Sequence, residues 1–255
     1  MKCQTFDWSR ITYPCFVQPK LNGVYCELKD GILASKTDKL FPAIAACNIF
    51  KPRFKDILVG ELYVHGWSLQ KILSAVTPDK PNDLSWKMEF HVYDIKNKDH
   101  QHTRMNLLHR DYTDTSFFKL VETRIVDSPA ELNLLYKEFL ADKYEGIIVR
   151  AYSGEWTDDR TWDIMKRKPF IDKEFLCIGV QEGEGKRKGH VGKFLFTTDK
   201  GIKFSCGGGQ ISYESLRFYL ANPPLNKMVT LRYQHTSDGG KPLCPQFIAV
   251  RSDYE

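Results

Sequence analysis

The sequence has no apolar run approaching the roughly 18 residues that cross a membrane, and its first residues lack the apolar core of a signal peptide. Its seven cysteines are odd in number and include no CxxC pair, so neither a zinc site nor a disulfide framework is expected. Low-complexity segments and internal repeats are also missing. These absences predict a soluble protein with no membrane partner. A reducing compartment is expected, either the cytoplasm or, for a viral protein, the interior of the host cell.

The composition is that of a globular protein, since 42% of the 255 residues are hydrophobic and 27% are charged. A chain of this length can form one large domain or two unequal ones. The 37 Lys and Arg residues exceed the 32 Asp and Glu residues and give a formal net charge of +5. This mild excess is compatible with a polyanionic partner but does not require one.

Residues 1–170 have the pattern of strands with inserted helices. Apolar alternation indicates strands at 57–59 and 90–95. Apolar residues at helical spacing predict a helix near 69–76, and a shorter one is expected at 106–110. Ser128-Pro129-Ala130-Glu131 is a capping box with proline in the first turn, which predicts a helix that continues to residue 140.

Beyond residue 170, short strand-like runs are separated by glycine, at 174–180, 193–197, 202–205, 228–234 and 246–251. Five strands with one helical insert at 212–220 predict an OB-type barrel. The expected fold class is therefore α+β, with a domain of antiparallel sheets and flanking helices at 1–170 and a small β-barrel at 171–255.

Five short motifs follow one another along the chain, and each alone arises easily by chance. They are Lys20-Leu21-Asn22-Gly23, Val59-Gly60-Glu61, Phe90-His91-Val92-Tyr93-Asp94, Glu145-Gly146-Ile147-Ile148-Val149-Arg150 and Lys166-Arg167-Lys168. In this order they supply an amine, carboxylates, an aromatic ring and cations, which together suit nucleotidyl transfer.

Lys20 is the candidate nucleophile, because it follows a strand that ends in Pro19 and precedes Gly23, which permits a tight backbone near a ligand. A lysine before a glycine turn is otherwise a solvated surface charge. Attack on phosphorus needs a neutral amine, whereas a free lysine titrates near ~10.4. Lys166 and Lys168, on one face of a strand, and a bound magnesium ion would favour the neutral form. Alone, this basic triplet indicates an exposed strand.

Glu61 and Glu145 stand where predicted strands end and begin, a position in which a carboxylate is most often a salt-bridge partner. Beside Lys20, Glu61 could instead bind a ribose hydroxyl or a metal ion, and Glu145 a hard cation. Phe90 lies on a predicted strand. Its ordinary role is core packing, and its alternative role is stacking on a purine.

In these motifs the chain resembles the ATP-dependent DNA ligases, especially the small two-domain enzymes of viruses, phages and some bacteria. The resemblance covers most of the chain and implies an adenylation (nucleotidyltransferase) domain at 1–170 and an OB-fold domain at 171–255. It implies the following roles: Lys20 as nucleophile, Glu61 as sugar and metal contact, Phe90 as adenine-stacking ring, Glu145 as metal ligand, and Lys166 and Lys168 as phosphate-binding residues.

The same resemblance implies that Lys36 contacts a nucleotide or DNA phosphate and that Gln18 lies where the adenine edge is read. Arg251 and Asp253 match a terminal Arg-x-Asp-Lys pattern, which is implied to orient the pyrophosphate leaving group. Segment 181–192 resembles the glycine-rich basic hairpin between the first two OB strands, although a solvated hairpin would look the same. The basic residues of this hairpin that are expected to bind DNA are Lys186, Arg187 and Lys188.

Three residues depart from the family pattern. Asn22 stands where the family has Asp, Tyr25 where Arg is customary, and Tyr254 where the terminal pattern ends in Lys. The departure at Asn22 bears on the rate of the DNA-dependent steps, and that at Tyr254 on self-adenylylation. None of the three changes the inferred fold.

The activity implied by the resemblance is the sealing of nicked double-stranded DNA by a monomer that uses ATP and Mg²⁺, with Mn²⁺ as a substitute. Lys20 would take AMP from ATP and pass it to the 5′-phosphate of the nick. The 3′-hydroxyl would then attack that phosphate and displace the AMP. DNA contacts are expected mainly at phosphates, so binding should depend on salt. No extra helical DNA-binding domain is expected before residue 1. The segment 212–220 would then be one candidate to reach over the DNA.

Four alternatives remain open at this stage. An RNA ligase shares the lysine chemistry but carries another C-terminal domain in its compact forms. An mRNA-capping guanylyltransferase prefers Asp-Gly where this chain has Glu145-Gly146. A catalytically impaired nucleic-acid-binding relative is supported only by the three departures. A metal-binding scaffold would rest on His100-Gln101-His102, which reads better as a polar turn.

Overall fold

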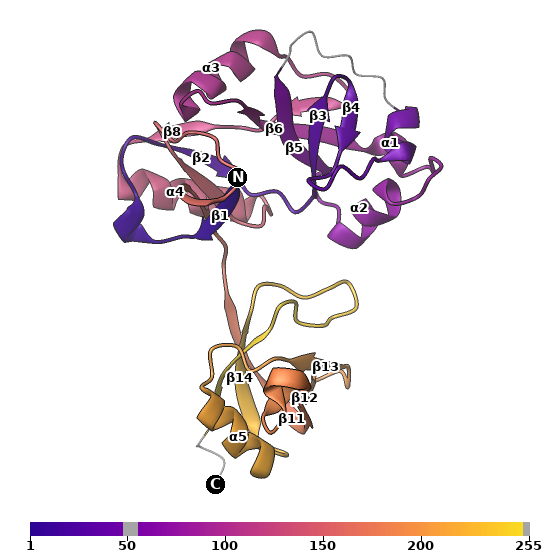
Figure 1. The fold of residues 1–255 in the computed structure, drawn as a ribbon, viewed down its shortest axis with the longest axis vertical. Coiled ribbons are helices and arrows are strands. Elements are labelled where there is room, and N and C mark those ends of the chain that lie inside the picture. Colours follow the sequence, from indigo (N-terminus) through magenta and orange to yellow (C-terminus); the bar gives the residue numbers. More distant parts are fainter. Residues whose placement is uncertain (48–55, 252–255) are drawn as a thin grey trace. The chain divides into compact units, whose positions relative to one another are not determined.

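The computed structural model describes residues 1–47 and 56–251 (Figure 1). The contacts between residues divide the chain into two compact units, Met1–Lys168 and Pro169–Glu255. This division falls two residues before the boundary that the sequence predicts.

The first unit contains two five-stranded sheets. One has the strand order β1 (Lys2–Thr5), β10 (Arg160–Arg167), β9 (Ile147–Ala151), β2 (Cys15–Pro19) and β8 (Arg124–Val126). The other has the order β4 (Ile32–Ala34), β3 (Val24–Lys29), β5 (Ile57–Tyr63), β6 (Glu89–Lys96) and β7 (Phe118–Leu120). Each sheet has one parallel pair, β1 with β10 and β6 with β7, and the remaining pairs are antiparallel.

In the described part of this unit, four α-helices accompany the sheets: α1 (Pro42–Cys47), α2 (Leu69–Val76), α3 (Gln101–Asp111) and α4 (Pro129–Ala141). The cap of α4 forms at Ser128, whose side chain accepts from the Glu131 N–H. The Glu131 carboxylate reaches back one residue further than in the standard capping box and accepts from the Asp127 N–H at 3.0 Å. The apolar side of α4 packs on the first sheet through Leu132 and Phe139. Three helices therefore lie where the sequence predicts them, whereas the six-residue α1 was not predicted.

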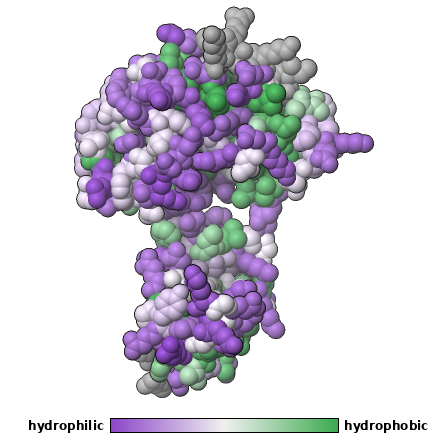
Figure 2. Space-filling model, viewed as in Figure 1, coloured by the Kyte–Doolittle hydropathy of each residue, from purple (hydrophilic) through white to green (hydrophobic). Residues whose placement is uncertain are grey.

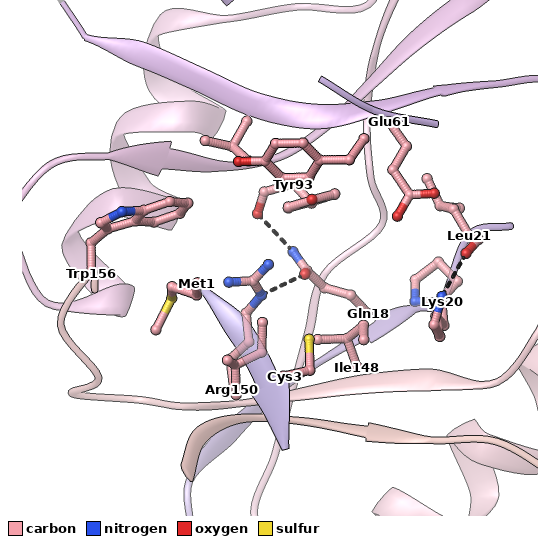
Figure 3. A pocket seen from close by; sticks show the side chains of 14 residues that line it. Met1, Cys3, Gln18, Lys20, Leu21, Glu61, Tyr93, Ile148, Arg150 and Trp156 are labelled. Carbon is pink, nitrogen blue, oxygen red and sulfur yellow. Dashed lines mark hydrogen bonds between the residues drawn. The ribbon is translucent and has the colours of Figure 1, made fainter. Parts of the chain in front are cut away.

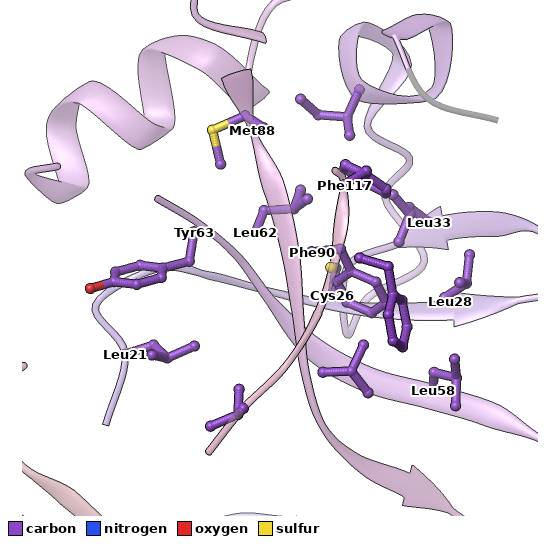
Figure 4. Close-up of a cluster of buried hydrophobic side chains, with 14 of the residues drawn as sticks. Leu21, Cys26, Leu28, Leu33, Leu58, Leu62, Tyr63, Met88, Phe90 and Phe117 are labelled. Atoms are coloured by element: carbon purple, nitrogen blue, oxygen red, sulfur yellow. The ribbon is translucent and has the colours of Figure 1, made fainter. Parts of the chain in front are cut away.

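The second sheet packs with α2 and α3 around the largest core of the molecule (Figure 4). Short 3₁₀ turns at Trp8–Arg10 and Ser85–Lys87 complete the unit. On the face shown in Figure 2, hydrophilic residues dominate both units and hydrophobic patches are small, because most large apolar side chains are in the cores. None of the helices in the described part of the chain combines the length and the apolar character that a bilayer-spanning segment needs.

The second unit is one antiparallel sheet in the order β13 (Lys203–Cys206), β12 (Val191–Thr197), β11 (Ile171–Glu182), β14 (Met228–Tyr233) and β15 (Gln246–Val250). A bridge between Gly207, next to β13, and Gln246 joins the two edge strands, so the sheet closes on itself. Helix α5 (Tyr213–Ala221) packs on the barrel core through buried Leu216, while Phe218 stays 59% exposed. The five predicted strands and the helical insert are thus confirmed.

Candidate active site

Lys20 is fixed by main-chain bonds to the segment that precedes β9. Its N–H donates to the Gly146 carbonyl at 2.8 Å, and its carbonyl accepts from the Glu145 N–H at 3.1 Å. Gly146 has φ of +147°, and a Cβ at this position would collide with the Arg167 carbonyl oxygen. The Glu-Gly pair of the fourth motif is therefore held between the lysine of the first motif and the strand of the fifth.

The carboxylate of Glu145 joins two lysines. Its Oε2 lies 2.5 Å from Lys20 Nζ, and its Oε1 accepts from Lys168 Nζ. The three side chains are only 17%, 10% and 15% exposed for Lys20, Glu145 and Lys168. Burial opposes ionisation of Glu145, but the two ammonium groups outweigh it and hold its pKa below the ordinary value. The lysine amine, a carboxylate and a second cation thus meet at one point.

Glu61, on β5, reaches the loop that carries Lys20. Its Oε2 accepts from the Gly23 N–H at 2.8 Å, and a Cβ on Gly23 would lie 2.6 Å from the Leu62 carbonyl oxygen, so this close approach requires glycine. Burial raises the pKa of Glu61, and the positive charge of Lys20 opposes that rise. The structure brings the second motif against the first.

A cavity of about 180 Å³ extends from these residues into the first unit (Figure 3). Lys20 and Glu61 lie at one end, and Met1, Arg150 and Trp156 lie at the other. The remaining lining residues are Cys3, Gln18, Pro19, Leu21, Tyr25, Val59, Tyr93, Ile148 and Ile164. The cavity therefore combines charged groups, Lys20 and Glu61 at one end and Arg150 at the other, with aromatic and aliphatic walls, which is the usual make-up of a ligand site.

The aromatic residue of β6 that lines this cavity is Tyr93, not Phe90. Phe90 is 0% exposed and lies in the core, with its ring centroid 6.5 Å from that of Phe117 and 6.2 Å from that of Phe118 (Figure 4). The pairing of β5 with β6 is irregular at this place, since Val59 pairs with Asp94 and Gly60 with Val92, which leaves Tyr93 unpaired. The prediction that Phe90 stacks on a purine is wrong for this structure, because the apolar face of the strand turns to the core.

Gln18 lines the cavity but is 1% exposed, and its amide is already engaged. Its Nε2 donates to the Tyr93 carbonyl at 3.1 Å and to Thr123 Oγ1 at 2.8 Å, and its Oε1 accepts from Arg150 Nε at 2.8 Å. The side chain thus holds the cavity wall through bonds within the protein, and its predicted position at the adenine edge stays a prediction.

The alternation of β10 explains the basic triplet. Lys166 shares a strand face with Ile164, which lines the cavity. Arg167 faces the other way and is surrounded by the rings of Phe6, Trp8 and Tyr136 at 5.0, 5.2 and 4.0 Å. Lys168 joins the site through Glu145, whereas Arg167 has a packing role that the sequence did not reveal. A phosphate-binding role of Lys166 stays a prediction.

The remaining predicted residues have the following surroundings. Lys36 is exposed in the turn after β4 and does not line the cavity. Arg251 donates from Nη1 to Glu174 Oε1 at 2.6 Å, and Asp253 lies outside the described residues. The three basic residues of the hairpin are exposed around a short 3₁₀ turn at Gly185–Arg187 between β11 and β12: they are Lys186, Arg187 and Lys188.

A buried polar network behind the cavity was missed by sequence reasoning. Asp94 is 0% exposed and accepts from Arg104 Nε at 2.8 Å and from Arg150 Nη1 at 2.6 Å. Gln101 Oε1 accepts from both guanidinium groups, at 2.6 and 3.3 Å. Asp94 is the last residue of the third motif and Arg150 is the last residue of the fourth, and these positions were the signal in the sequence that could have pointed to the network. Arg104 and Gln101 lie on α3, whose contact with these strands exists only in the folded chain.

Within the described ranges, no group of three His, Cys, Asp or Glu side chains could hold a metal ion by itself.

Comparison with known proteins relates this site to a family. Residues 182–251 match the family model of the DNA ligase OB-like domain. The DNA ligase of African swine fever virus, isolate Tick/South Africa/Pretoriuskop Pr4/1996, is 32% identical over 200 residues, covering 69% of this chain and 46% of the viral protein. Over these residues the chain is similar to DNA ligases. It spans about half the length of these viral relatives.

Solved structures agree on the fold. The structure of a Lig E DNA ligase, from work on DNA binding with a minimal scaffold, has a TM-score of 0.86 at 22% identity and covers 98% of each chain. The ATP-dependent DNA ligase of bacteriophage T7, in complex with ATP, has a TM-score of 0.56 at 17% identity, again with 98% coverage of both chains. The predicted architecture, a nucleotidyltransferase domain followed by an OB domain, is confirmed.

Proposed function

We propose that this chain seals nicks between a 3′-hydroxyl and a 5′-phosphate in duplex DNA, using ATP and a lysyl-AMP intermediate on Lys20. The observation that carries the proposal is the position of the Lys20 amine. It lies 2.5 Å from Glu145 and beside Lys168, at the charged end of a cavity with an aromatic wall. The similarity to DNA ligases supports nick sealing over other uses of this arrangement.

In the first step, Lys20 loses a proton to solvent and its neutral Nζ attacks the α-phosphorus of ATP. The N–P bond forms and the bond from the α-phosphorus to the bridging oxygen breaks. Pyrophosphate leaves with the bonding electron pair, and the second proton of the amine passes to solvent. Lys168, which pairs with Glu145, and Lys166, on the β10 face of Ile164, would balance the negative charge that develops on the phosphate oxygens.

In the second step, a 5′-phosphate oxygen of the nick attacks the phosphorus of the lysyl-AMP, and the N–P bond breaks to release Lys20, which regains its protons. In the third step, the 3′-hydroxyl attacks the 5′-phosphorus, AMP leaves with the electron pair, and the hydroxyl proton is released. The protein contributes positioning and charge stabilisation in all three steps.

The carboxylates near Lys20 fit a magnesium ion. Mg²⁺ is usually held by only one or two carboxylates together with substrate phosphates. Both carboxylates lie at the Lys20 loop, since Glu61 accepts from the Gly23 N–H at 2.8 Å and Glu145 lies 2.5 Å from the Lys20 amine. These two residues would hold Mg²⁺, or Mn²⁺ in its place. The ion would supply Lewis-acid stabilisation of the phosphate charge.

For DNA, the exposed basic hairpin of the second unit, with Lys186, Arg187 and Lys188, offers contacts to phosphates. Nicked double-stranded DNA is the proposed partner, and a monomer is the proposed state because the chemistry needs no second subunit. An intracellular location stays a prediction.

The test is to incubate the protein with magnesium and α-labelled ATP, GTP or NAD and to measure its intact mass. We expect an AMP-sized adduct from ATP only. Lys20→Arg should abolish the adduct while keeping a cation beside Glu145, and Lys137→Ala, on the exposed side of α4, should leave it unchanged. The adenylylated protein should then seal nicked DNA. Sealing of nicked RNA instead would overturn the DNA assignment, and an adduct that survives Lys20→Arg would overturn the nucleophile.

A further inference from the structure

Arg167 is the last residue of β10 and stands between the two lysines of the fifth motif, and none of the three proposed reaction steps uses it. Its guanidinium carbon lies near the centroids of three aromatic rings, at 5.0 Å for Phe6, 5.2 Å for Trp8 and 4.0 Å for Tyr136. Its Nη1 donates to Asn133 Oδ1 at 2.7 Å. Two of the rings belong to the segment after β1, and the third ring and the asparagine belong to α4. The side chain thus fastens the end of β10 to two other parts of the first unit.

The main chain of Arg167 touches the segment that holds Lys20. Its carbonyl oxygen packs so closely on Gly146 that a Cβ there would collide with it. The Gly146 carbonyl accepts from the Lys20 N–H at 2.8 Å, and the Lys20 carbonyl accepts from the Glu145 N–H at 3.1 Å. A shift of the Arg167 main chain would therefore reach the nucleophile, because a close-packed contact has no gap that could absorb it.

Lys168 depends on the same anchor. The pairing of β10 with β9 ends at Arg167 and Ile147, so Lys168 lies past the last pair. Its amine contacts one oxygen of Glu145, whose other oxygen lies 2.5 Å from Lys20 Nζ. A lysine side chain has many rotamers, so the position of its amine depends on how firmly the backbone just before it is held.

We infer that Arg167 is a positioning residue for the transfer of AMP to Lys20. Its guanidinium, held by the three rings, fixes the end of β10 and thereby the arrangement of Lys168, Glu145 and Lys20. A flat cation suits this task, because it lies against aromatic faces and donates a hydrogen bond at the same time. The inference rests on the proposed function. A displacement of about 1 Å at reacting groups can slow a reaction by about 100-fold, so the rate should suffer more than the binding of ATP.

The first test is single-turnover formation of the AMP adduct, at a temperature where thermal unfolding shows every variant to be folded. For Arg167→Met, the maximal rate should fall by about tenfold or more, while the half-saturating ATP concentration changes by less than about threefold. Arg167→Lys keeps a cation among the rings and should react at least about threefold faster than Arg167→Met. Trp8→Leu should slow the reaction on its own but add nothing to Arg167→Met, because the ring acts through the guanidinium. Since Trp8 is 44% exposed, this variant also carries the test if Arg167→Met does not fold.

Arg124→Met is the matched control. Arg124 lies on β8 of the same sheet, and its guanidinium carbon is 5.8 Å from the ring centroid of Phe139 on α4. Its Nη2 donates to Glu138 Oε1 at 2.8 Å, on the same helix. The control therefore removes a similar contact between the same sheet and helix, outside the fifth motif, and should keep the wild-type rate within about twofold. Equal slowing by Arg124→Met and Arg167→Met would overturn the inference, as would a wild-type maximal rate in Arg167→Met.

A second test needs no reaction with ATP. The protein is treated with an amine-acetylating reagent, and the modification of each lysine is measured by mass spectrometry. Lys168 is 15% exposed and paired with Glu145. In Arg167→Met it should be acetylated about threefold faster or more, because its amine loses the partner that keeps it protonated and covered. Exposed Lys137 serves as the reference. Unchanged acetylation of Lys168 would overturn the inference whether or not the adduct forms, whereas a wild-type protein that forms no adduct would overturn the proposed function alone.

Discussion

Replacing Phe90 and Tyr93 in turn by leucine separates the two aromatic residues of β6 by their roles. Phe90 is fully buried and packs against Phe117 and Phe118. Aromatic pairs of this kind contribute about 0.5–1.5 kcal/mol each beyond burial, and leucine leaves unfilled volume, so Phe90→Leu should cost about 1–3 kcal/mol of stability. At about 2–4 °C for each kcal/mol in a protein of this size, the melting temperature should fall by about 2–12 °C.

Tyr93→Leu should instead act on the nucleotide. The ring lines the cavity, and stacking of a base on an aromatic side chain contributes about 1–3 kcal/mol. Loss of the ring should therefore raise the ATP concentration that half-saturates adduct formation by about 5- to 150-fold. The fall in melting temperature should be smaller than for Phe90→Leu, because Tyr93 is only partly buried.

The assay is single-turnover formation of the AMP adduct over a range of ATP concentrations, with thermal unfolding measured on the same samples. Phe90→Leu should keep the wild-type half-saturation within about twofold, since the core residue does not reach the cavity. A Phe90→Leu protein that melts like the wild type but needs at least fivefold more ATP would refute the reasoning, as would an unchanged ATP requirement in Tyr93→Leu.

Three further predictions concern charged residues. Because the folded pKa of Glu145 lies below its ordinary value, its contribution to stability is full above about pH 4.3 and is lost as the pH falls through the folded pKa. In urea unfolding at pH 7, Glu145→Gln should therefore be about 1–3 kcal/mol less stable than the wild type, and this difference should close in acid. Equal stability of the two proteins at both pH values would contradict this. If Arg251 orients the pyrophosphate, Arg251→Ala should slow adduct formation about tenfold or more while sealing of a pre-adenylylated nick continues at the wild-type rate; equal slowing of both would argue against that role. Replacing Lys186, Arg187 and Lys188 by alanine should make the slope of log binding constant against log salt concentration less steep, by about 0.9 for each DNA phosphate that these side chains neutralise. An unchanged slope would mean that these side chains do not contact DNA phosphates.

Local patterns were sufficient for three helices of the first unit, for the elements of the second unit and for most of the charged site. Helical spacing and the capping box at Ser128 predicted α4, because a cap and a first turn involve only neighbouring residues. The Lys20, Glu61 and Glu145 motifs were likewise recognisable, since each contains a glycine that lets the backbone approach closely: Gly23, Gly60 and Gly146. The short helix α1 was not predicted, since six residues carry too little periodic signal.

The sequence by itself determined which elements form and which residues can carry the chemistry, because those properties follow from neighbours along the chain. The tertiary structure decided which side of each strand meets the cavity. Alternation placed Phe90 and Tyr93 on opposite faces, but only the packing of β6 on α2 and α3 made one face the core. It also decided the partners of Arg150, since Asp94, Gln101 and Gln18 lie 56, 49 and 132 positions away in the chain. No local pattern encodes such distant contacts, because they form only when the sheets and α3 come together.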